Sequence, residues 1–221
     1  MPKKEKIELM FDKIAPRYDL LNNILSVGTH WIWKRKLIKE IEHSAPQSIL
    51  DVATGTGDII GQFNDRAIRL SGSDISKEML SEAKLKFPDI TFIVDDITES
   101  QFLDKSYDVS CISYGIRNVS SIEKALVEMQ RITKNKILIL EFGQPQNFFL
   151  KAIYFGVMKY FIPFIGSLFS SKDSYKYLIE SSMNFPSGDL FKKLCEEKLD
   201  CQSVDVIPIF GGITYLYIIK L

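Results

Sequence analysis

The feature that most constrains this chain is an apolar segment that runs directly into a glycine-rich turn. The segment reads SILDVATGTGD and covers residues 48–58. Its first half is a short apolar run, typical of a strand that is buried on both faces. Gly55 and Gly57 then let the backbone pass close to a ligand where a Cβ would clash. We therefore expect a buried strand that ends at a ligand-binding turn.

The runs that follow predict the fold class. Apolar, β-rich segments recur at 69–74, 90–96, 107–115 and 136–142, and segments with helical periodicity separate them. This alternation is typical of a doubly wound α/β sheet. Two further β-rich runs flank Gly211-Gly212, which predicts an antiparallel hairpin. The expected fold is thus a largely parallel α/β sheet with an antiparallel end.

The spacing of apolar residues also predicts the helices. We expect them at 4–14, 29–42, about 58–65, a segment that begins after Ser76, 121–132 and near 187–198. Ser76 is a candidate N-cap, and Met79, Leu80 and Ala83 would face inward from the helix after it. Ser187 is a candidate cap for the last helix.

Composition excludes several classes of protein. A chain of 221 residues suits a single domain with a sizeable core. Its 28 basic and 28 acidic residues balance, so no global field attracts nucleic acid. Three cysteines without a CxxC pair, with His30 and His43 as the only histidines, predict neither a disulfide framework nor a metal site. The basic start precedes no apolar signal core, so a cytoplasmic location is expected.

Two cofactors fit a glycine turn at the end of a first strand. Gly61 completes GxGxxxG, a dinucleotide-binding variant, so an NAD(P) oxidoreductase is one alternative. However, NAD brings a pyrophosphate, which carboxylates at Asp51 and Asp58 would repel. S-adenosylmethionine brings a sulfonium, an ammonium, a ribose diol and an adenine, and no phosphate. The acidic residues therefore favour S-adenosylmethionine.

Polar residues after the next strands extend this expected cleft. Asp74 ends the second strand, where its carboxylate would accept both ribose hydroxyls. Asp95-Asp96 after the third strand would accept the adenine amino group, and Ile75 and Ile97 would be apolar walls. Ser113, near the end of the fourth strand, would line the same cleft.

Several motifs, in order along the chain, resemble the C-methyltransferases of ubiquinone and menaquinone biosynthesis. They are FDKIAPRYDLLNNILSVGTHWIWKRK (11–36), LDVATGTGD, SYGIRNV (113–119), LEFGQP (140–145) and SYKYLIESSMNFP (174–186). The resemblance implies a Rossmann-like class I methyltransferase fold of seven strands with the seventh antiparallel. It also implies S-adenosylmethionine as methyl donor and a ring carbon of a prenylated quinol as acceptor. By motif, Thr56, Asp74, Asp96 and Ser113 would hold the cofactor beside Gly55 and Gly57.

The sequence departs from that family at four places. Trp31 stands where a basic residue is usual, Gly143-Gln144 replaces Ser-Lys, Asp96 replaces a common Asn, and the last strand lacks the usual His. These changes leave the cofactor assignment in place and bear on the acceptor site.

Methylation of a ring carbon needs an ionised or strongly hydrogen-bonded hydroxyl next to it, and then loss of the ring proton. Our catalytic candidates are Arg117, Asn118 and Tyr18. Arg117 would favour the ionised quinol or order a water that takes the proton, and Tyr18 and Asn118 would orient the hydroxyl. The alternatives are an ion pair for Arg117 and a packed aromatic for Tyr18. His30 would reach the site only if the N-terminal helices form a lid.

An apolar, aromatic stretch over residues 148–169 stands out after the fifth strand. Lys159 at its middle and Pro163 argue against a membrane-spanning helix, and spanning would split the sheet. We expect one domain over 1–221, with a helical lid at 1–45 and a helical insertion at 145–186 that covers the acceptor site. The alternatives for the stretch are a dimer interface and plain core.

The expected partners are a prenylated quinol and, peripherally, the inner face of a membrane, while a homodimer and the choice between naphthoquinol and benzoquinol stay open. The alternative functions are a methyltransferase for another lipophilic small molecule and a non-catalytic scaffold that retains the fold. The GTGD and GIRN loops speak against the scaffold, because a scaffold needs neither.

Overall fold

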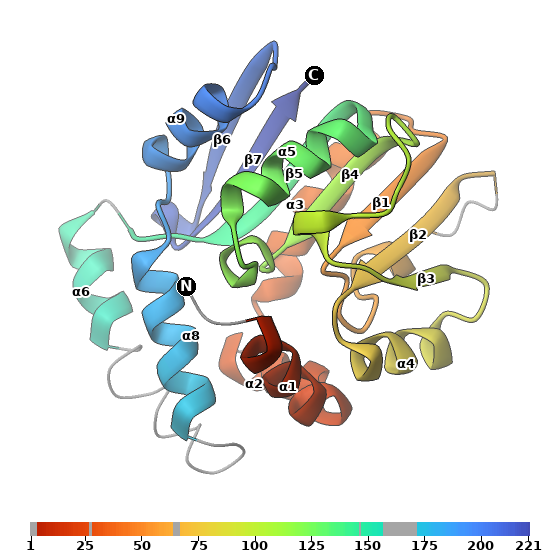
Figure 1. The fold of residues 1–221 in the computed structure, drawn as a ribbon. Coiled ribbons are helices and arrows are strands. Elements are labelled where there is room, and N and C mark those ends of the chain that lie inside the picture. Colours follow the sequence, from red (N-terminus) through yellow and green to blue (C-terminus); the bar gives the residue numbers. More distant parts are fainter. Residues whose placement is uncertain (1–3, 27, 64–66, 146, 157–171) are drawn as a thin grey trace.

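The computed structural model describes residues 4–26, 28–63, 67–145, 147–156 and 172–221. In this part of the chain seven strands form one sheet in the order β3-β2-β1-β4-β5-β7-β6. The strands are β1 (Ser48–Val52), β2 (Arg69–Asp74), β3 (Thr91–Val94), β4 (Tyr107–Ser113), β5 (Thr133–Phe142), β6 (Ser203–Ile209) and β7 (Thr214–Lys220) (Figure 1).

The strand directions confirm the predicted fold. β1 pairs in parallel with β2 and β4, and β3 and β5 extend this parallel sheet on either side. β7 lies antiparallel between β5 and β6, so the predicted C-terminal hairpin is also confirmed. Pro208 lies in β6, an edge strand, which is where a proline is tolerated within a sheet.

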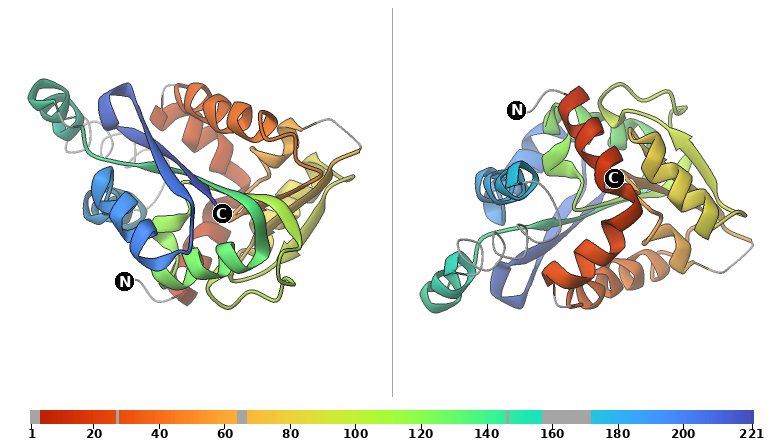
Figure 2. Two further views of the ribbon diagram at one scale, coloured as in Figure 1. Left: turned by 90° about the horizontal axis from the view of Figure 1, so that it is seen from above. Right: turned by 90° about the horizontal axis from the view of Figure 1, so that it is seen from below.

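Helices cover both faces of the sheet. The helices of the described ranges are α1 (Lys4–Ile14), α2 (Tyr18–Ser26), α3 (His30–Glu42), α4 (Lys77–Lys86), α5 (Ile122–Ile132), α6 (Phe148–Gly156), α8 (Lys172–Asn184) and α9 (Asp189–Lys198). α5 and α9 bury their apolar residues against one face, and α3 and α4 against the other (Figure 2). Each face therefore has its own apolar core.

The helix after the second strand forms for the local reason that the sequence predicts. The hydroxyl of Ser76 accepts a hydrogen bond from the backbone N–H of Met79 at 3.1 Å, which caps α4. Met79, Leu80 and Ala83 are buried on its inner face, as predicted.

Two local predictions are wrong. The expected helix at about 58–65 is only a 3-10 turn at Ile60–Gln62, which ends at an extended Phe63, and residues 64–66 lie outside the described part.

Ser187 does not cap α9. Gly188, with φ +65°, occupies that position, and the Ser187 hydroxyl instead accepts the backbone N–H of Gln144 at 3.3 Å. Glycine adopts a positive φ at little steric cost. The backbone conformation at this position therefore favours glycine over a residue with a capping side chain.

The helices at the carboxyl ends of the parallel strands position the site. α1, α2 and α8 lie together at that edge of the sheet (Figure 1), and the sequence did not predict α2. Residues 157–171, which hold most of the aromatic stretch 148–169, lie outside the described residues, so the covering role expected for this stretch stays a prediction. None of the described helices has the length and apolar character that a membrane span requires.

The packing of Gly61 generates a prediction. A Cβ at Gly61 would lie 2.2 Å from Cζ of Phe87, and the same ring limits Gly57. Internal packing thus accounts for the third glycine of GxGxxxG. Gly61→Ala is expected to lower the free energy of unfolding by about 1–3 kcal/mol, measured by urea denaturation. In a Phe87→Leu background the cost should be smaller, and equal costs in the two backgrounds would contradict this reason.

Candidate active site

A cleft lies at the carboxyl ends of β1 to β4, with about 730 Å³ of empty space that includes its opening to solvent. The predicted site residues on its wall are Tyr18, Gly55, Asp74, Asp96, Ser113 and Asn118. Ile7 and Phe11 of α1 line it as well, so the N-terminal helices form part of the wall. Thr56, Gly57 and Arg117 lie in the adjoining loops but do not line the cleft. Most of the predicted site residues are therefore brought together.

Asp74 fixes the glycine turn to the second strand. One carboxylate oxygen accepts the backbone N–H of Gly55 and the other accepts that of Ser76, both at 2.9 Å. Gly55 and Gly57 have φ of +57° and +83°, conformations that favour glycine. Burial raises the pKa of the Asp74 carboxyl, while the N–H groups of Ser76 and Gly55 lower it. The carboxylate is thus held in place at the cleft wall.

The residues present fit S-adenosylmethionine. Two buried oxygens on the cleft wall, Oγ of Ser113 and Oδ2 of Asp95, have no hydrogen-bond partner among the described residues. Such oxygens are normally satisfied in a folded protein, and a hydroxyl- and amine-bearing ligand would satisfy them. Asp96 accepts the N–H of Thr98 at 3.0 Å, which orders the loop at this wall.

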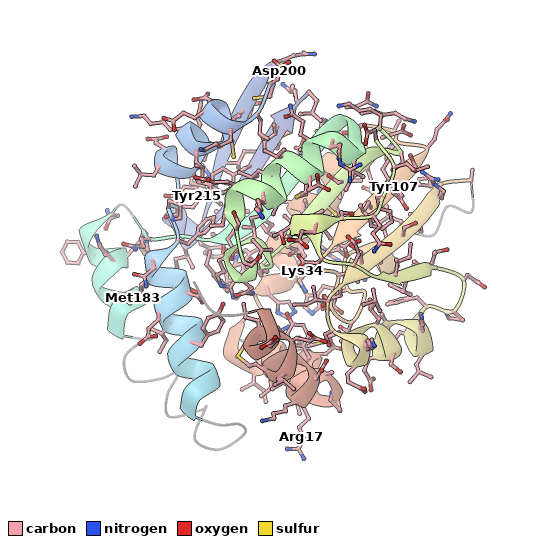
Figure 3. The ribbon with its side chains drawn as sticks, in the orientation of Figure 1. Arg17, Lys34, Tyr107, Met183, Asp200 and Tyr215 are labelled. Carbon is pink, nitrogen blue, oxygen red and sulfur yellow. The ribbon has the colours of Figure 1, made fainter. Side chains whose placement is uncertain are left out.

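The two other acids near the turn are placed differently from what the sequence predicts. Asp51 is buried below the turn, where it accepts from Thr54 Oγ1 at 2.6 Å and from Cys111 Sγ at 3.5 Å. Asp58 pairs with Nζ of Lys34 at 2.9 Å. Figure 3 shows Lys34 in the interior, whereas Arg17 points outward. Neither acid lines the cleft. The carboxyl groups on the cleft wall, which would repel a pyrophosphate there, are those of Asp74, Asp95 and Asp96.

Two aspartates that the sequence analysis missed tie the N-terminal helices to the cofactor loops. Asp12 of α1 accepts the hydroxyl of Ser76 at 2.6 Å. Asp19, at the start of α2, accepts the hydroxyl of Thr56 at 2.7 Å and pairs with Lys86 of α4. Both lie inside the motif at 11–36, and this motif is the one feature of the sequence that could have pointed to them.

Arg117 makes the ion pair that the sequence analysis held as its alternative. Its NH1 donates to Oε1 of Glu141 at 2.5 Å and to the carbonyl oxygen of Tyr114 at 2.8 Å. The side chains of Arg117 and Glu141 are 7% and 0% exposed. Glu141 lies in the motif LEFGQP, but no spacing rule links it to Arg117 along the chain.

Asn118 and Tyr18 lie on the cleft wall. The Asn118 amide donates to the carbonyl of Tyr114 at 3.3 Å, and its Oδ1 accepts the hydroxyl of Tyr177 in α8 at 3.0 Å. Burial raises the pKa of the Tyr18 hydroxyl, and hydrogen bonding to Asn22 and the charge of Arg117 oppose this. Tyr18 therefore stays protonated and able to donate a hydrogen bond.

His30 is a packed residue in this structure. It is buried, its Nδ1 lies 2.6 Å from Oγ of Ser26, and its ring packs against Trp31. It does not line the cleft. Burial and the charge of Lys34 lower the pKa of its ring, so the neutral form is favoured.

Comparison with known proteins identifies the family. The sequence model of the ubiE/COQ5 methyltransferase family matches residues 1–218. The chain belongs to this family. A ubiquinone/menaquinone biosynthesis C-methyltransferase UbiE of Bdellovibrio bacteriovorus is 40% identical over 225 residues, which cover 98% of this chain and 96% of that protein. A demethylmenaquinone methyltransferase of Bacteroides fragilis is 37% identical over 97% of this chain and 92% of its own.

Solved structures agree with the fold of this family member. A SAM-dependent methyltransferase of Thermotoga maritima superposes with a TM-score of 0.68 over 95% of this chain and 97% of its own, at 14% identity. The class I methyltransferase fold, the family and the enzyme class, an S-adenosylmethionine-dependent C-methyltransferase, are thereby confirmed.

The raised pKa of Asp51 predicts a pH dependence of stability. Burial raises the pKa from 3.8 to about 6, although hydrogen bonds from Thr54 and Cys111 lower it. The folded state therefore binds this proton more tightly than the unfolded chain. The resulting stabilisation is complete below 3.8 and is lost as the pH rises through about 6. A shift of this size corresponds to roughly 3 kcal/mol.

Asp51→Asn cannot ionise, so its free energy of unfolding should fall less than that of the wild type between about pH 4 and pH 7. Urea denaturation across this range measures the difference. Asp89→Asn, at an exposed acid, is the control and should follow the wild type. Parallel curves for Asp51→Asn and the wild type would contradict the prediction.

Proposed function

We propose that this chain transfers a methyl group from S-adenosylmethionine to a ring carbon of a prenylated quinol, in respiratory quinone biosynthesis. The acceptor would be demethylmenaquinol or the equivalent benzoquinol. Family membership supports the proposal, since the relatives named above act in ubiquinone and menaquinone biosynthesis or on demethylmenaquinone. The observation that carries it is the cleft that joins Asp74 and the unpaired oxygens of Ser113 and Asp95 to Tyr18 and Asn118.

The proposed cofactor residues are Gly55, Thr56, Gly57, Asp74, Asp96 and Ser113. When bound, the cofactor supplies an electrophilic methyl group on a sulfonium. Asp74 would accept the ribose hydroxyls with the lone pairs that Gly55 and Ser76 leave free. Asp96 would accept the adenine amino group between the apolar walls Ile75 and Ile97. No metal is proposed. In the described ranges no three His, Cys, Asp or Glu residues are grouped to hold one.

The proposed catalytic residues have two different roles toward the acceptor. Tyr18 and Asn118 would orient the quinol hydroxyl, because both lie on the cleft wall and carry hydrogen-bonding groups. Arg117 would favour the ionised quinol or order a water that takes the ring proton. The ring carbon would form the new C–C bond as the bond between the methyl group and the donor sulfur breaks, S-adenosylhomocysteine would leave, and the ring would then lose its proton to the ordered water. Arg117 would act from behind the wall, through its charge or a water.

We also propose that residues 1–45 act as a helical lid and residues 145–186 as a cover for the acceptor site, within one domain. The contacts of Asp12 and Asp19 support the lid, and the hydrogen bond from Tyr177 to Asn118 supports the cover. Phe149 in α6 is 77% exposed, which supports a peripheral contact of this cover with a membrane surface, at its cytoplasmic side. A homodimer is the alternative use of that surface.

Cofactor binding provides the first test. S-adenosylhomocysteine should raise the melting temperature of the wild type, and calorimetry should show that Asp74→Asn binds it roughly 10–100-fold more weakly, because hydrogen bonds to a charged acceptor are lost. Asp89→Asn is the control and should bind normally. Quenching or enhancement of NADH fluorescence on titration, without an effect of S-adenosylhomocysteine, would instead favour an oxidoreductase.

Methyl transfer provides the second test. The enzyme is incubated with labelled S-adenosylmethionine and each reduced, demethylated quinone, and the products are analysed by mass. We expect a ring-methylated quinol from at least one acceptor, and a kcat that is about 100-fold lower in Arg117→Ala. Unchanged kcat with only weaker quinol binding would refute the proton-loss role of Arg117. Labelled product from neither quinol would favour another lipophilic acceptor.

A further inference from the structure

Glu141 is a buried acid to which the proposed mechanism gives no part. It follows Ile137–Leu140 in β5. These four apolar residues and Glu141 itself are all buried. Its side chain is 0% exposed. A carboxylate in such a strand loses its hydration and must be compensated by hydrogen bonds or by an opposite charge.

The compensation comes from Arg117 and from the adjoining backbone. Oε1 of Glu141 accepts NH1 of Arg117 at 2.5 Å and the N–H of Phe142 at 2.8 Å. Oε2 lies 3.4 Å from the backbone nitrogen of Arg117, which donates to it. The carboxylate of Glu141 therefore binds both the side chain and the main chain of Arg117. Within the described ranges this is the one ion pair that Glu141 makes.

Other contacts fix the same guanidinium. The carbonyl of Tyr114 accepts NH1 of Arg117 and the amide of Asn118. Tyr114 has φ +56°, a strained backbone conformation for a bulky residue. The ring of Phe142 packs with its centroid 5.0 Å from Cζ of Arg117. The backbone, a ring and a carboxylate thus converge on one cation.

The charge of Arg117 acts on the cleft. Burial raises the pKa of the hydroxyls of Tyr18 and Tyr177, and the charge of Arg117 lowers both. Tyr18 lies on the cleft wall, and Tyr177 donates to Asn118 on that wall. Arg117 is also joined to this wall by geometry, because the carbonyl oxygen of Tyr114 accepts both its NH1 and the amide of Asn118.

Stability alone does not require this pair. Buried ion pairs often contribute no more than well-packed apolar residues of the same volume, because both ions must be desolvated. Apolar residues already fill the rest of the run Ile137–Leu140. A buried Glu–Arg pair beside a cleft is better explained by the placement of the arginine.

We propose that Glu141 is a positioning residue for methyl transfer, which fixes the guanidinium of Arg117 so that its charge acts on the bound acceptor. This inference rests on the proposed function and deepens it. Glu141 does not line the cleft, so it acts through Arg117 alone. Its removal should therefore matter only while Arg117 is present.

The test compares Glu141→Gln, Arg117→Met and the double variant Glu141→Gln/Arg117→Met by steady-state kinetics with the quinol that the wild type methylates. Glu141→Gln is expected to lower kcat by at least about tenfold, through misplacement of the guanidinium, with little change in the KM for S-adenosylmethionine. In the Arg117→Met background, Glu141→Gln should cause no further loss of kcat, because the effect runs through Arg117.

Controls separate this role from a structural one. Glu128→Gln breaks a surface pair with Arg131, in which the oxygen–nitrogen distance is 2.7 Å, and should leave kcat unchanged. Glu141→Gln leaves a buried cation unpaired and should lower the melting temperature, whereas the double variant is neutral at both positions and should regain stability. Binding of S-adenosylhomocysteine by each variant reports that the cofactor cleft is intact.

Two results would overturn the positioning role. One is wild-type kcat in Glu141→Gln, and the other is an equal loss of kcat on adding Glu141→Gln to the wild type and to Arg117→Met. A wild-type protein that binds S-adenosylhomocysteine but methylates no quinol would overturn the proposed function, and this inference with it. The two failures are thus distinguished by the wild-type reaction.

Discussion

The carboxylate of Asp74 joins three elements that meet at the cleft. It accepts the N–H of Gly55 from the turn after β1 and that of Ser76 at the start of α4, and it ends β2 itself. Ser76 in turn caps α4 and donates to Asp12 of the N-terminal helices. The shape of the turn, the start of α4 and the position of α1 therefore depend on one carboxyl group. A ribose-bearing ligand would meet an acceptor that is already oriented.

The extent to which the sequence predicts this structure follows the range of the interactions. Buried strands and the Ser76 cap are set by a few neighbouring residues, so periodicity and composition predict them. The expected helix near 58–65 is wrong because the chain becomes extended at Phe63, and the Ser187 cap is wrong because Gly188 adopts a positive φ at that position. The convergence of parallel strands at one edge explains why most of the proposed cofactor residues line one cleft.

Polar side chains that pair across the fold cannot be predicted in this way. Lys34 with Asp58 and Arg117 with Glu141 are each 24 positions apart, and Asp12 with Ser76 is 64 apart. No periodicity relates their members, so only the assembled sheet brings them together. The acids at Asp51 and Asp58 show the consequence. Sequence proximity to the turn suggested that they face a ligand, whereas one is buried and the other is neutralised.

The position of β7 in the sheet constrains when the site can form during synthesis. β5 carries Glu141, and its outer edge is completed only by β7, where Glu141 lies opposite Tyr215. β7 is the last of the seven strands to leave the ribosome, after the whole of 145–186. Glu141, which binds Arg117, therefore lies in a strand whose outer edge is unpaired until β7 has been synthesised. Until then the apolar edge of β5 is exposed. The Arg117–Glu141 ion pair therefore gains its complete sheet only after β7 has been synthesised.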